Sequence, residues 1–270
     1  MRGRRAEVRE RIQSAASGQA PFPVTIPRAL ARWWRENLPR LGLTRAAGMF
    51  LGEMWEFLRD STPQRRKQRY GDVDFDWDYR VDTTSANVSR RADLLAILAG
   101  CRYQPSDPAL FHESIRSLGI DYRQFQFIDV GSGKGRTLLM ASDYPFHRIA
   151  GVEAVPALHR VALENIRKYR SESQKCFDLE SVCGDARDFQ FPEAALVLFL
   201  FHPLPEPGLR EVMANLRVSL RELPRPVYVV YHNPLLEHVL AEDGGLQRVR
   251  GDMRCAIYEF PIAGRQLAKP

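Results

Sequence analysis

The chain has 270 residues, of which 27% are charged, and a formal net charge of +6. This length allows one sizeable domain with an extension, and the composition is ordinary for a globular protein. Since no run of about 18 uninterrupted apolar residues occurs, we expect no membrane span. The charged start lacks the apolar core of a secretory signal, and the four cysteines lack C-x-x-C or zinc spacing. We therefore expect reduced thiols in a cytoplasmic protein.

The positive charge is concentrated near the start of the chain. Residues 1–70 hold 15 Lys and Arg against 6 acidic residues, whereas the remainder holds 24 against 27. Residues 1–23 have few large apolar side chains, which predicts a disordered basic tail. Such an arm either attracts nucleic acid or anionic lipid, or is simply solvated.

Residues 24–110 are predicted to form a helical N-terminal region. Apolar side chains recur at helical spacing from residue 28 to about residue 69, with Trp33 and Trp34 among them. Tryptophans beside arginines occur in helices at membrane surfaces, but more often they are the core face of a helix that arginine stems cover. We expect this region to form a lid or a wall over the pocket in which the domain that follows binds its substrate, called the acceptor pocket below.

An acidic stretch lies within this region, over residues 71–82. Its aspartates alternate with aromatic residues, as acids do in some cation-binding loops. The glycine and the terminal glutamate of a calcium loop are missing, so we expect no metal here. The aspartates are Asp72, Asp74, Asp76, Asp78 and Asp82.

Strands and helices alternate from residue 125 onward, which indicates a parallel α/β sheet. Apolar runs predict strands at 126–130, 148–152, 179–183, 195–201 and 227–231, and a closing antiparallel pair at 246–250 and 256–260. Helices are predicted at 156–169, 206–223 and 235–241. Residues 111–270 should therefore form a doubly wound, mostly parallel sheet with a C-terminal antiparallel hairpin.

The segment FIDVGSGKGRTLLMA is the most informative part of the chain. A short apolar strand ends at Asp129, and glycines follow at alternate positions (Gly131, Gly133, Gly135) before a helical run. Such glycines let the backbone approach a ligand closely and leave bare amide N–H groups for it. The spacing excludes the dinucleotide pattern G-x-G-x-x-G, because its last position is Arg136, and it also differs from the phosphate loop.

A strand-terminal acid followed by G-x-G-x-G resembles the first motif of class I S-adenosylmethionine-dependent methyltransferases. Bacterial members with Val-Asp-Thr, Tyr-x-Pro-Ser/Thr and Asp-x-Gly-Ser-Gly-Lys-Gly-Arg segments are similar to residues 81–83, 103–106 and 129–136. The resemblance spans roughly residues 80–262. It implies S-adenosyl-L-methionine as cofactor, a Rossmann-like seven-stranded sheet, and a glycine loop against the amino-acid part of the cofactor. The loop residues implied in binding are Asp129, Gly131, Ser132, Gly133 and Gly135.

The same resemblance implies further cofactor contacts. Glu153 ends the second strand, where an acid can bind a ribose diol, although it could also be a surface glutamate. Asp185 and Ala186 follow the third strand at the adenine position of the family, and the alternative for Asp185 is a helix N-cap. Ser106 lies in a Pro-Ser turn that related lysine methyltransferases place beside the cofactor. Either Ser106 or Asp107 is expected to cap the next helix.

Candidate catalytic residues follow the fourth and fifth strands. His202 stands in Phe-His-Pro-Leu-Pro, which resembles the Asn/Asp-Pro-Pro-aromatic motif of amino-group methyltransferases. Leu204 displaces the second proline, so specificity for an amino group does not follow. His202 is either a general base or a wall of the pocket. Tyr231, His232 and Asn233 are expected in the same crevice. Two histidines at adjacent strand ends could bind a metal, but the sequence offers no third ligand, so we expect none.

The leading hypothesis is therefore a methyltransferase that acts on a small molecule or a protein side chain. The basic N-terminal region leaves RNA as an alternative acceptor. A second alternative is aminopropyl transfer on the same fold, which an acid at the position of His202 would favour. A third is a cofactor-binding scaffold without catalysis. The acceptor and the oligomeric state stay open.

Overall fold

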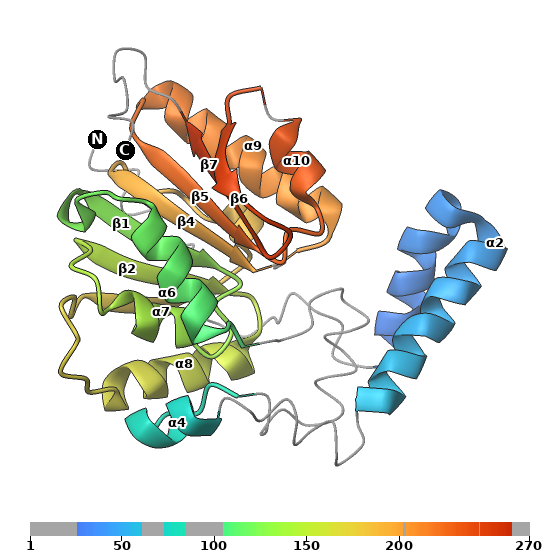
Figure 1. Ribbon diagram of the computed structural model, residues 1–270. Coiled ribbons are helices and arrows are strands. Elements are labelled where there is room, and N and C mark those ends of the chain that lie inside the picture. Colours follow the sequence, from blue (N-terminus) through green and yellow to red (C-terminus); the bar gives the residue numbers. More distant parts are fainter. Residues whose placement is uncertain (1–25, 61–72, 85–104, 202–203, 243, 261–270) are drawn as a thin grey trace, which may run out of the picture.

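The structure, a computed structural model, describes residues 26–60, 73–84, 105–201, 204–242 and 244–260. The predicted basic tail over residues 1–23, the candidate catalytic residue His202 and the first half of the Tyr-x-Pro-Ser segment lie outside these ranges. The described residues form an α/β domain and a helical part beside it (Figure 1). None of the described helices is long and apolar enough to cross a membrane.

Seven strands form one sheet in the order β3-β2-β1-β4-β5-β7-β6. Strands β1 to β5 are parallel neighbours, and β7 runs antiparallel to both β5 and β6. The predicted sheet with its antiparallel C-terminal hairpin is therefore confirmed. The strands are β1 (Phe125–Val130), β2 (Arg148–Glu153), β3 (Leu179–Cys183), β4 (Ala195–Phe201), β5 (Val227–His232), β6 (Gln247–Gly251) and β7 (Cys255–Phe260).

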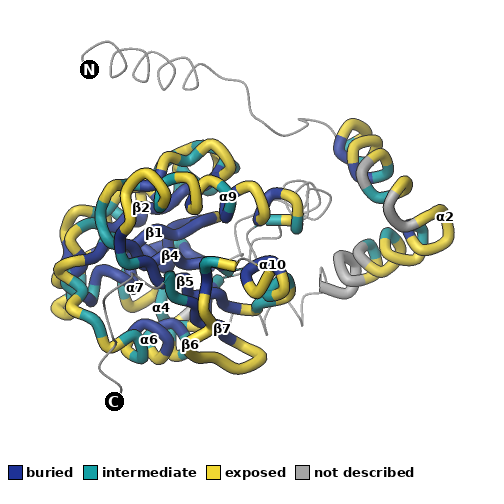
Figure 2. The backbone as a smooth tube through the Cα atoms, turned by 90° about the horizontal axis from the view of Figure 1, so that it is seen from above, coloured by how far each residue is buried: buried dark blue, intermediate teal, exposed yellow. Residues whose placement is uncertain are grey.

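Helices cover both faces of the sheet, as the continuous apolar run of β4 requires. One core joins β-strand side chains to α6 (Pro108–Ser117) and α7 (Arg136–Ala141). The other joins the opposite face to α9 (Glu206–Glu222) and α10 (Glu237–Ala241). Helix α8 (Pro156–Lys168) connects β2 to β3. Figure 2 shows the buried strands between helices whose outer sides are exposed.

From residue 125 onward, the predicted strands and helices lie within a residue or two of the observed ones. The largest offset is at α10, which starts at Glu237 instead of residue 235. Asn233 takes a positive φ of 48°, and the amide of Glu237 donates to the carbonyl of Pro234 at 3.1 Å. The chain therefore completes a turn before the helix can begin.

The N-terminal region contains two described helices. Helix α2 (Ile26–Asp60) bends at Gly42, which has a φ of 73°, and its two arms pack on each other. Trp33 is buried in that contact, 5.2 Å from the ring of Phe50, as the core-face interpretation predicts. In Figure 1 α2 lies to one side of the α/β domain. The short helix α4 (Val73–Tyr79) lies beside α8.

Phe127 in β1 tests this packing, because its side chain is fully buried among the rings of Phe111, Phe146 and Phe199. Phe127→Ala should lower the free energy of unfolding by about 3–5 kcal/mol through the cavity it leaves. Phe177→Ala is the matched control, since Phe177 is 78% exposed. It should change stability by less than about 0.5 kcal/mol. Urea unfolding of both variants measures this, and equal effects would contradict the described core.

Candidate active site

The glycine loop folds back on the neighbouring strand. The amides of Gly131 and Ser132 both donate to the carbonyl of Val152 in β2, at 2.8 and 3.1 Å, and Gly135 donates to Ser132 at 2.8 Å. The φ angles of Gly131, Gly133 and Gly135 are 78°, 56° and 82°. Residues other than glycine rarely adopt such φ angles without strain, so the three alternate glycines are what allows the turn.

The loop does not leave these amides bare. The amide of Gly133 donates to the Glu153 carboxylate at 2.8 Å, and those of Gly131, Ser132 and Gly135 donate to backbone carbonyls. The expectation of bare N–H groups is therefore wrong for these four residues. A phosphate site needs such groups to point at the anion. Such a row of free amides is therefore not formed by these four residues.

Gly151 of β2 makes room for this turn. A Cβ at Gly151 would lie 2.5 Å from the Cβ of Ser132 and 2.9 Å from Leu138 Cδ1, which is closer than side chains approach. The hydroxyl of Ser132 is buried and has no hydrogen-bond partner among the described residues. A buried hydroxyl without a partner is destabilising, so a ligand that bonds it gains affinity.

Asp129 lies at the end of β1 and is 2% exposed. Burial raises the pKa of its carboxyl to about 7, and the nearby negative charge of Glu153 adds to this, while a hydrogen bond from the Thr137 hydroxyl opposes it. Asp129 therefore changes protonation near neutral pH. A cationic ligand group beside it would favour the charged form.

Glu153 faces the same loop from the end of β2. One carboxylate oxygen accepts from the amide of Gly133 and the other from that of Val155 at 2.7 Å. Burial raises the pKa of Glu153, and the amides of Val155, Gly133 and Ala154 oppose the rise. A carboxylate has about four acceptor sites, so an acceptor remains for a ligand hydroxyl.

Asp185 follows β3 and caps the short 3-10 helix Ala186–Asp188. Its carboxylate accepts from the backbone amide of Arg187 at 2.9 Å and pairs with the guanidinium of the same residue at 2.6 Å. These contacts agree with the N-cap interpretation, and the adenine contact stays a prediction. Ala186 is buried and packs into the core beside α9.

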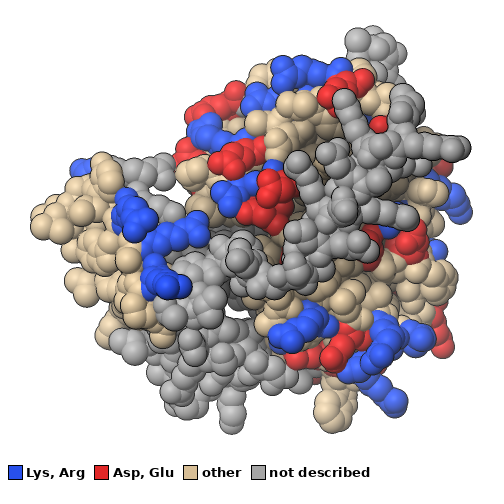
Figure 3. Space-filling view, turned by 180° about the vertical axis from the view of Figure 1, so that it is seen from behind, with Lys and Arg blue, Asp and Glu red and all other residues tan. Residues whose placement is uncertain are grey.

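Helix α2 has an electrostatic link to this position. Arg187 is the main cause of the lowered pKa of Asp185, and the charge of Arg32 in α2 contributes. In Figure 3 the cationic side chains of α2 gather on the side that faces the α/β domain. Arg32 of α2 is therefore close enough to Asp185 to act on it electrostatically.

At the start of α6, Asp107 is the N-cap. Its side chain accepts from the amide of Leu110 at 2.9 Å, which decides between the two predicted caps. Ser106 is buried immediately before it. The cofactor contact predicted for Ser106 is not tested by these contacts.

The structure separates Tyr231 from His232, because neighbouring side chains of a strand point to opposite faces. Tyr231 lies in the core beside α9 and α10, and its hydroxyl accepts from the amide of Leu236 at 3.4 Å. His232 points toward α6, with Nε2 2.9 Å from the Ser114 hydroxyl, and burial lowers its pKa to about 4. The expectation that both line one crevice is therefore wrong. A catalytic role for Tyr231 stays a prediction.

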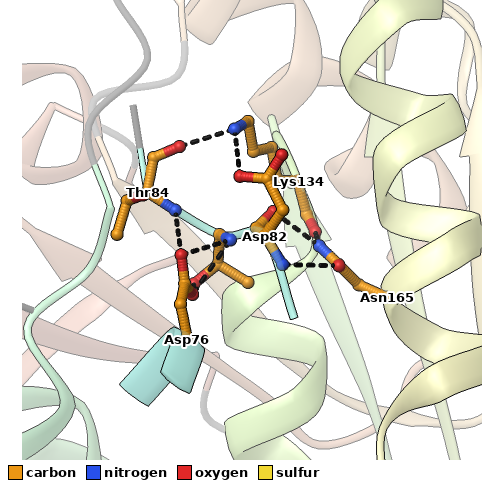
Figure 4. Close-up of polar contacts among 6 residues, drawn as sticks. Asp76, Asp82, Thr84, Lys134 and Asn165 are labelled. Atoms are coloured by element: carbon orange, nitrogen blue, oxygen red, sulfur yellow. Dashed lines mark hydrogen bonds and ion pairs between the residues drawn. The ribbon is translucent and has the colours of Figure 1, made fainter. Parts of the chain in front are cut away.

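Sequence reasoning missed the partners of the two cations in the loop. Lys134 is 2% exposed, and its Nζ donates to Asp82 Oδ1 and to the carbonyl of Thr84, both at 2.6 Å (Figure 4). The guanidinium of Arg136 lies 4.6 Å from the ring centre of Phe75. The only signal in the sequence is a pair of cations in the loop and a run of acids far upstream, and it does not specify the pairing.

No family model matches this chain, and no curated protein matches it by sequence. Among solved structures, it is similar to an RNA methyltransferase from Salinibacter ruber in complex with S-adenosyl-L-homocysteine, at 20% identity over 61% of this chain and 97% of that one, with a TM-score of 0.41. It is also similar to a ribosomal protein L11 methylase from Lactobacillus delbrueckii subsp. bulgaricus, at 16% identity over 56% of this chain and 75% of that one, with a TM-score of 0.39. A third similar structure is a SAM dependent methyltransferase from Aquifex aeolicus, at 15% identity over 57% of this chain and 97% of that one, with a TM-score of 0.41. Such low identities and TM-scores carry no functional argument, so the function is inferred from the chain's own residues.

The raised pKa of Asp129 predicts how stability depends on pH. The folded state binds a proton at Asp129 up to about pH 7, whereas the unfolded state releases it near pH 4. Its contribution is therefore fully present below about pH 4 and is lost as the pH rises through about 7. At 1.36 kcal/mol per pKa unit, the loss is as much as about 4 kcal/mol.

Asp129→Asn removes this titration and keeps an oxygen that can accept from Thr137. Urea unfolding between pH 4.5 and 8 should show the stability of the wild type falling relative to that of the variant as pH rises. A constant difference across this range would contradict the assignment.

Proposed function

We propose that this protein is an S-adenosylmethionine-dependent methyltransferase. The observation that carries the proposal is the pair of buried acids, Asp129 and Glu153, on either side of a glycine turn at the carboxyl end of two parallel strands. Ligands of open α/β sheets bind at this edge. A buried acid whose charged form a neighbouring cation would favour suits the ammonium of an amino acid, and a carboxylate with a spare acceptor suits a ribose diol.

The loop also argues against a phosphate-bearing ligand. Four of its amides already have acceptors in the protein, and the charge of Lys134 is neutralised by Asp82. Neither the row of amides nor the free lysine of a phosphate loop is present among these residues. A nucleoside joined to an amino acid fits this chemistry better than a dinucleotide or a nucleoside triphosphate.

Each part of the cofactor would be bound by different residues of the site. Asp129 would hold the ammonium, the loop from Gly131 to Gly135 would pack against the amino-acid part, and Glu153 would accept from the ribose. Asp185 and Ala186 would flank the adenine, and Ser106 would close the site from the start of α6. The orphaned hydroxyl of Ser132 supports a ligand at the loop.

When bound, S-adenosylmethionine supplies a methyl group that its sulfonium already activates. The task of the protein is then to align the acceptor and exclude water. The buried acids and the packed loop would hold the cofactor side of this geometry. A base is needed only for an acceptor that arrives protonated, and His202 is the candidate for that role.

The helical N-terminal region would form the acceptor side. The charge of Arg32 in α2 acts on Asp185, which supports a lid or wall beside the adenine end of the site. The acceptor class we favour is a small molecule or a protein side chain, with RNA as the alternative that the basic residues suit.

Cys176, Cys183 and Cys255 are free thiols, in keeping with a cytoplasmic protein.

Calorimetric titration of the purified protein tests the cofactor directly. S-adenosylmethionine and S-adenosylhomocysteine should bind, and NAD should not, because the loop offers no site for a pyrophosphate. Tight binding of NAD, or no heat with either sulfur nucleoside, would overturn the proposed function.

Glu153→Gln tests the ribose contact. Loss of a charged hydrogen bond should weaken S-adenosylhomocysteine binding by about 1–3 kcal/mol, which is roughly 5- to 150-fold. Glu180→Gln is the matched control, since Glu180 lies on the adjacent strand and its exposed carboxylate pairs with Arg148. Calorimetry on both variants measures the change. An affinity equal to that of the wild type in Glu153→Gln would remove Glu153 from the site.

A further inference from the structure

Residues 73–84, called the strap below, form a closed unit that is held by one side chain. Asp76 accepts from the amides of Thr83 and Thr84 at 2.9 and 2.8 Å, and its carbonyl accepts from the amide of Val81 at 3.0 Å. Thr83 and Thr84 are buried although they belong to neither a helix nor a strand. Asp76 therefore gives the strap a fixed shape, and this accounts for one acid of the run.

A second acid of the strap attaches it to the glycine loop. Asp82 pairs with Lys134 at 2.6 Å, and the carbonyl of Thr84 accepts a second hydrogen bond from the same Nζ (Figure 4). The Lys134 side chain is 2% exposed and that of Asp82 is 34% exposed. A buried ammonium is strongly destabilising without a counter-charge. The position of Lys134 thus depends on the strap.

Asn165 of α8 connects both partners. Its Nδ2 donates to the carbonyls of Asp82 and Lys134 at 2.7 and 2.9 Å, while its Oδ1 accepts from the amide of Asp82 at 2.8 Å. All of its contacts in Figure 4 are with backbone atoms of the strap or the loop. Asn165 therefore fixes the backbones of the two segments relative to each other.

Apolar and cation–π contacts complete the attachment. Val81 packs with Leu139 of α7 and with Tyr169 at the end of α8. The guanidinium of Arg136 lies over Phe75 of the strap. Lys134, between the last two glycines, and Arg136, directly after them, thus both contact the strap.

The attachment of the strap acts on the same loop residues that are proposed to contact the cofactor. Lys134 stands between Gly133 and Gly135, and the amide of Gly133 is one of those that bind the Glu153 carboxylate. A shift of Lys134 would move the backbone on which the amino-acid part of the cofactor would pack, and would weaken one of the hydrogen bonds to Glu153. Asp82 is therefore coupled to both halves of the site through a single residue.

We propose that the strap is a component of the cofactor site, in which Asp82 and Lys134 are positioning residues that hold the glycine loop in its binding shape. The proposal rests on the proposed function. It assigns to Asp82 a role in cofactor affinity that is exerted through the loop. A strap that only braces the fold would change the unfolding temperature and leave the affinity of the folded protein unchanged.

The experiment uses three variants of the full chain: Asp82→Asn, Lys134→Met and the double variant. Asp82→Asn leaves a buried ammonium without its counter-charge, so S-adenosylhomocysteine affinity should fall about tenfold or more at a temperature where the protein is folded. The double variant has no uncompensated buried charge and should bind better than Asp82→Asn alone. Such non-additivity is the signature of a coupled pair.

The exposed pair Glu164–Lys168 on α8 is the matched control, because it lies on the helix that carries Asn165. Glu164→Gln with Lys168→Met removes the same two charges and should leave the affinity within about twofold, as expected of a surface pair. Wild-type affinity in Asp82→Asn, even with a lowered unfolding temperature, would overturn the proposal. If Asp82→Asn does not fold, Lys134→Met and the double variant decide it.

Hydrogen exchange of the amides of residues 131–135 in the free protein separates the two proposals. Asp82→Asn should speed their exchange and leave that of β4 unchanged. A wild type that binds no S-adenosylhomocysteine would overturn the proposed function, whereas unchanged exchange in Asp82→Asn would overturn the role of the strap.

Discussion

The rest of the structure depends on the burial of three ionisable groups beside one glycine turn. Asp129, Glu153 and Lys134 are each less than a tenth exposed. Water would solvate such groups outside the protein, so each needs a specific partner inside it. Thr137, the amides of the loop and Asp82 supply these partners. The turn after β1 is therefore a place where backbone shape and charge are set together.

The sheet brings these groups to one edge. The register pairs Asp129 with Gly151, so the ends of β1 and β2 coincide and the loop after β1 can bond to Val152. Helices on both faces leave the carboxyl edge as the place where polar side chains gather. The two acids approach the loop from adjacent strands, and the strap approaches it from the other side. The loop is held between them by contacts that come from three parts of the chain.

This arrangement changes the interpretation of the N-terminal half. Two acids of this run have structural partners, because Asp76 closes the strap and Asp82 binds the loop lysine. Arg32 of helix α2 acts electrostatically on Asp185. Two segments that precede the sheet in the chain thus bear on the proposed cofactor site. In the proposed function, recognition of the acceptor and binding of the cofactor would therefore involve neighbouring segments.

Local patterns in the sequence were enough to predict the strands, the helices, the antiparallel hairpin and the glycine turn. Each depends on neighbours a few residues apart, such as the apolar run of β4 or the three alternate glycines. The tertiary structure alone decided which groups meet. Lys134 pairs with Asp82 across 52 positions, the loop amides find acceptors on β2, and Tyr231 and His232 point to opposite faces. The physical reason is that a buried charge or amide is destabilising without a hydrogen-bond partner, and only the packed fold brings that partner within hydrogen-bond distance.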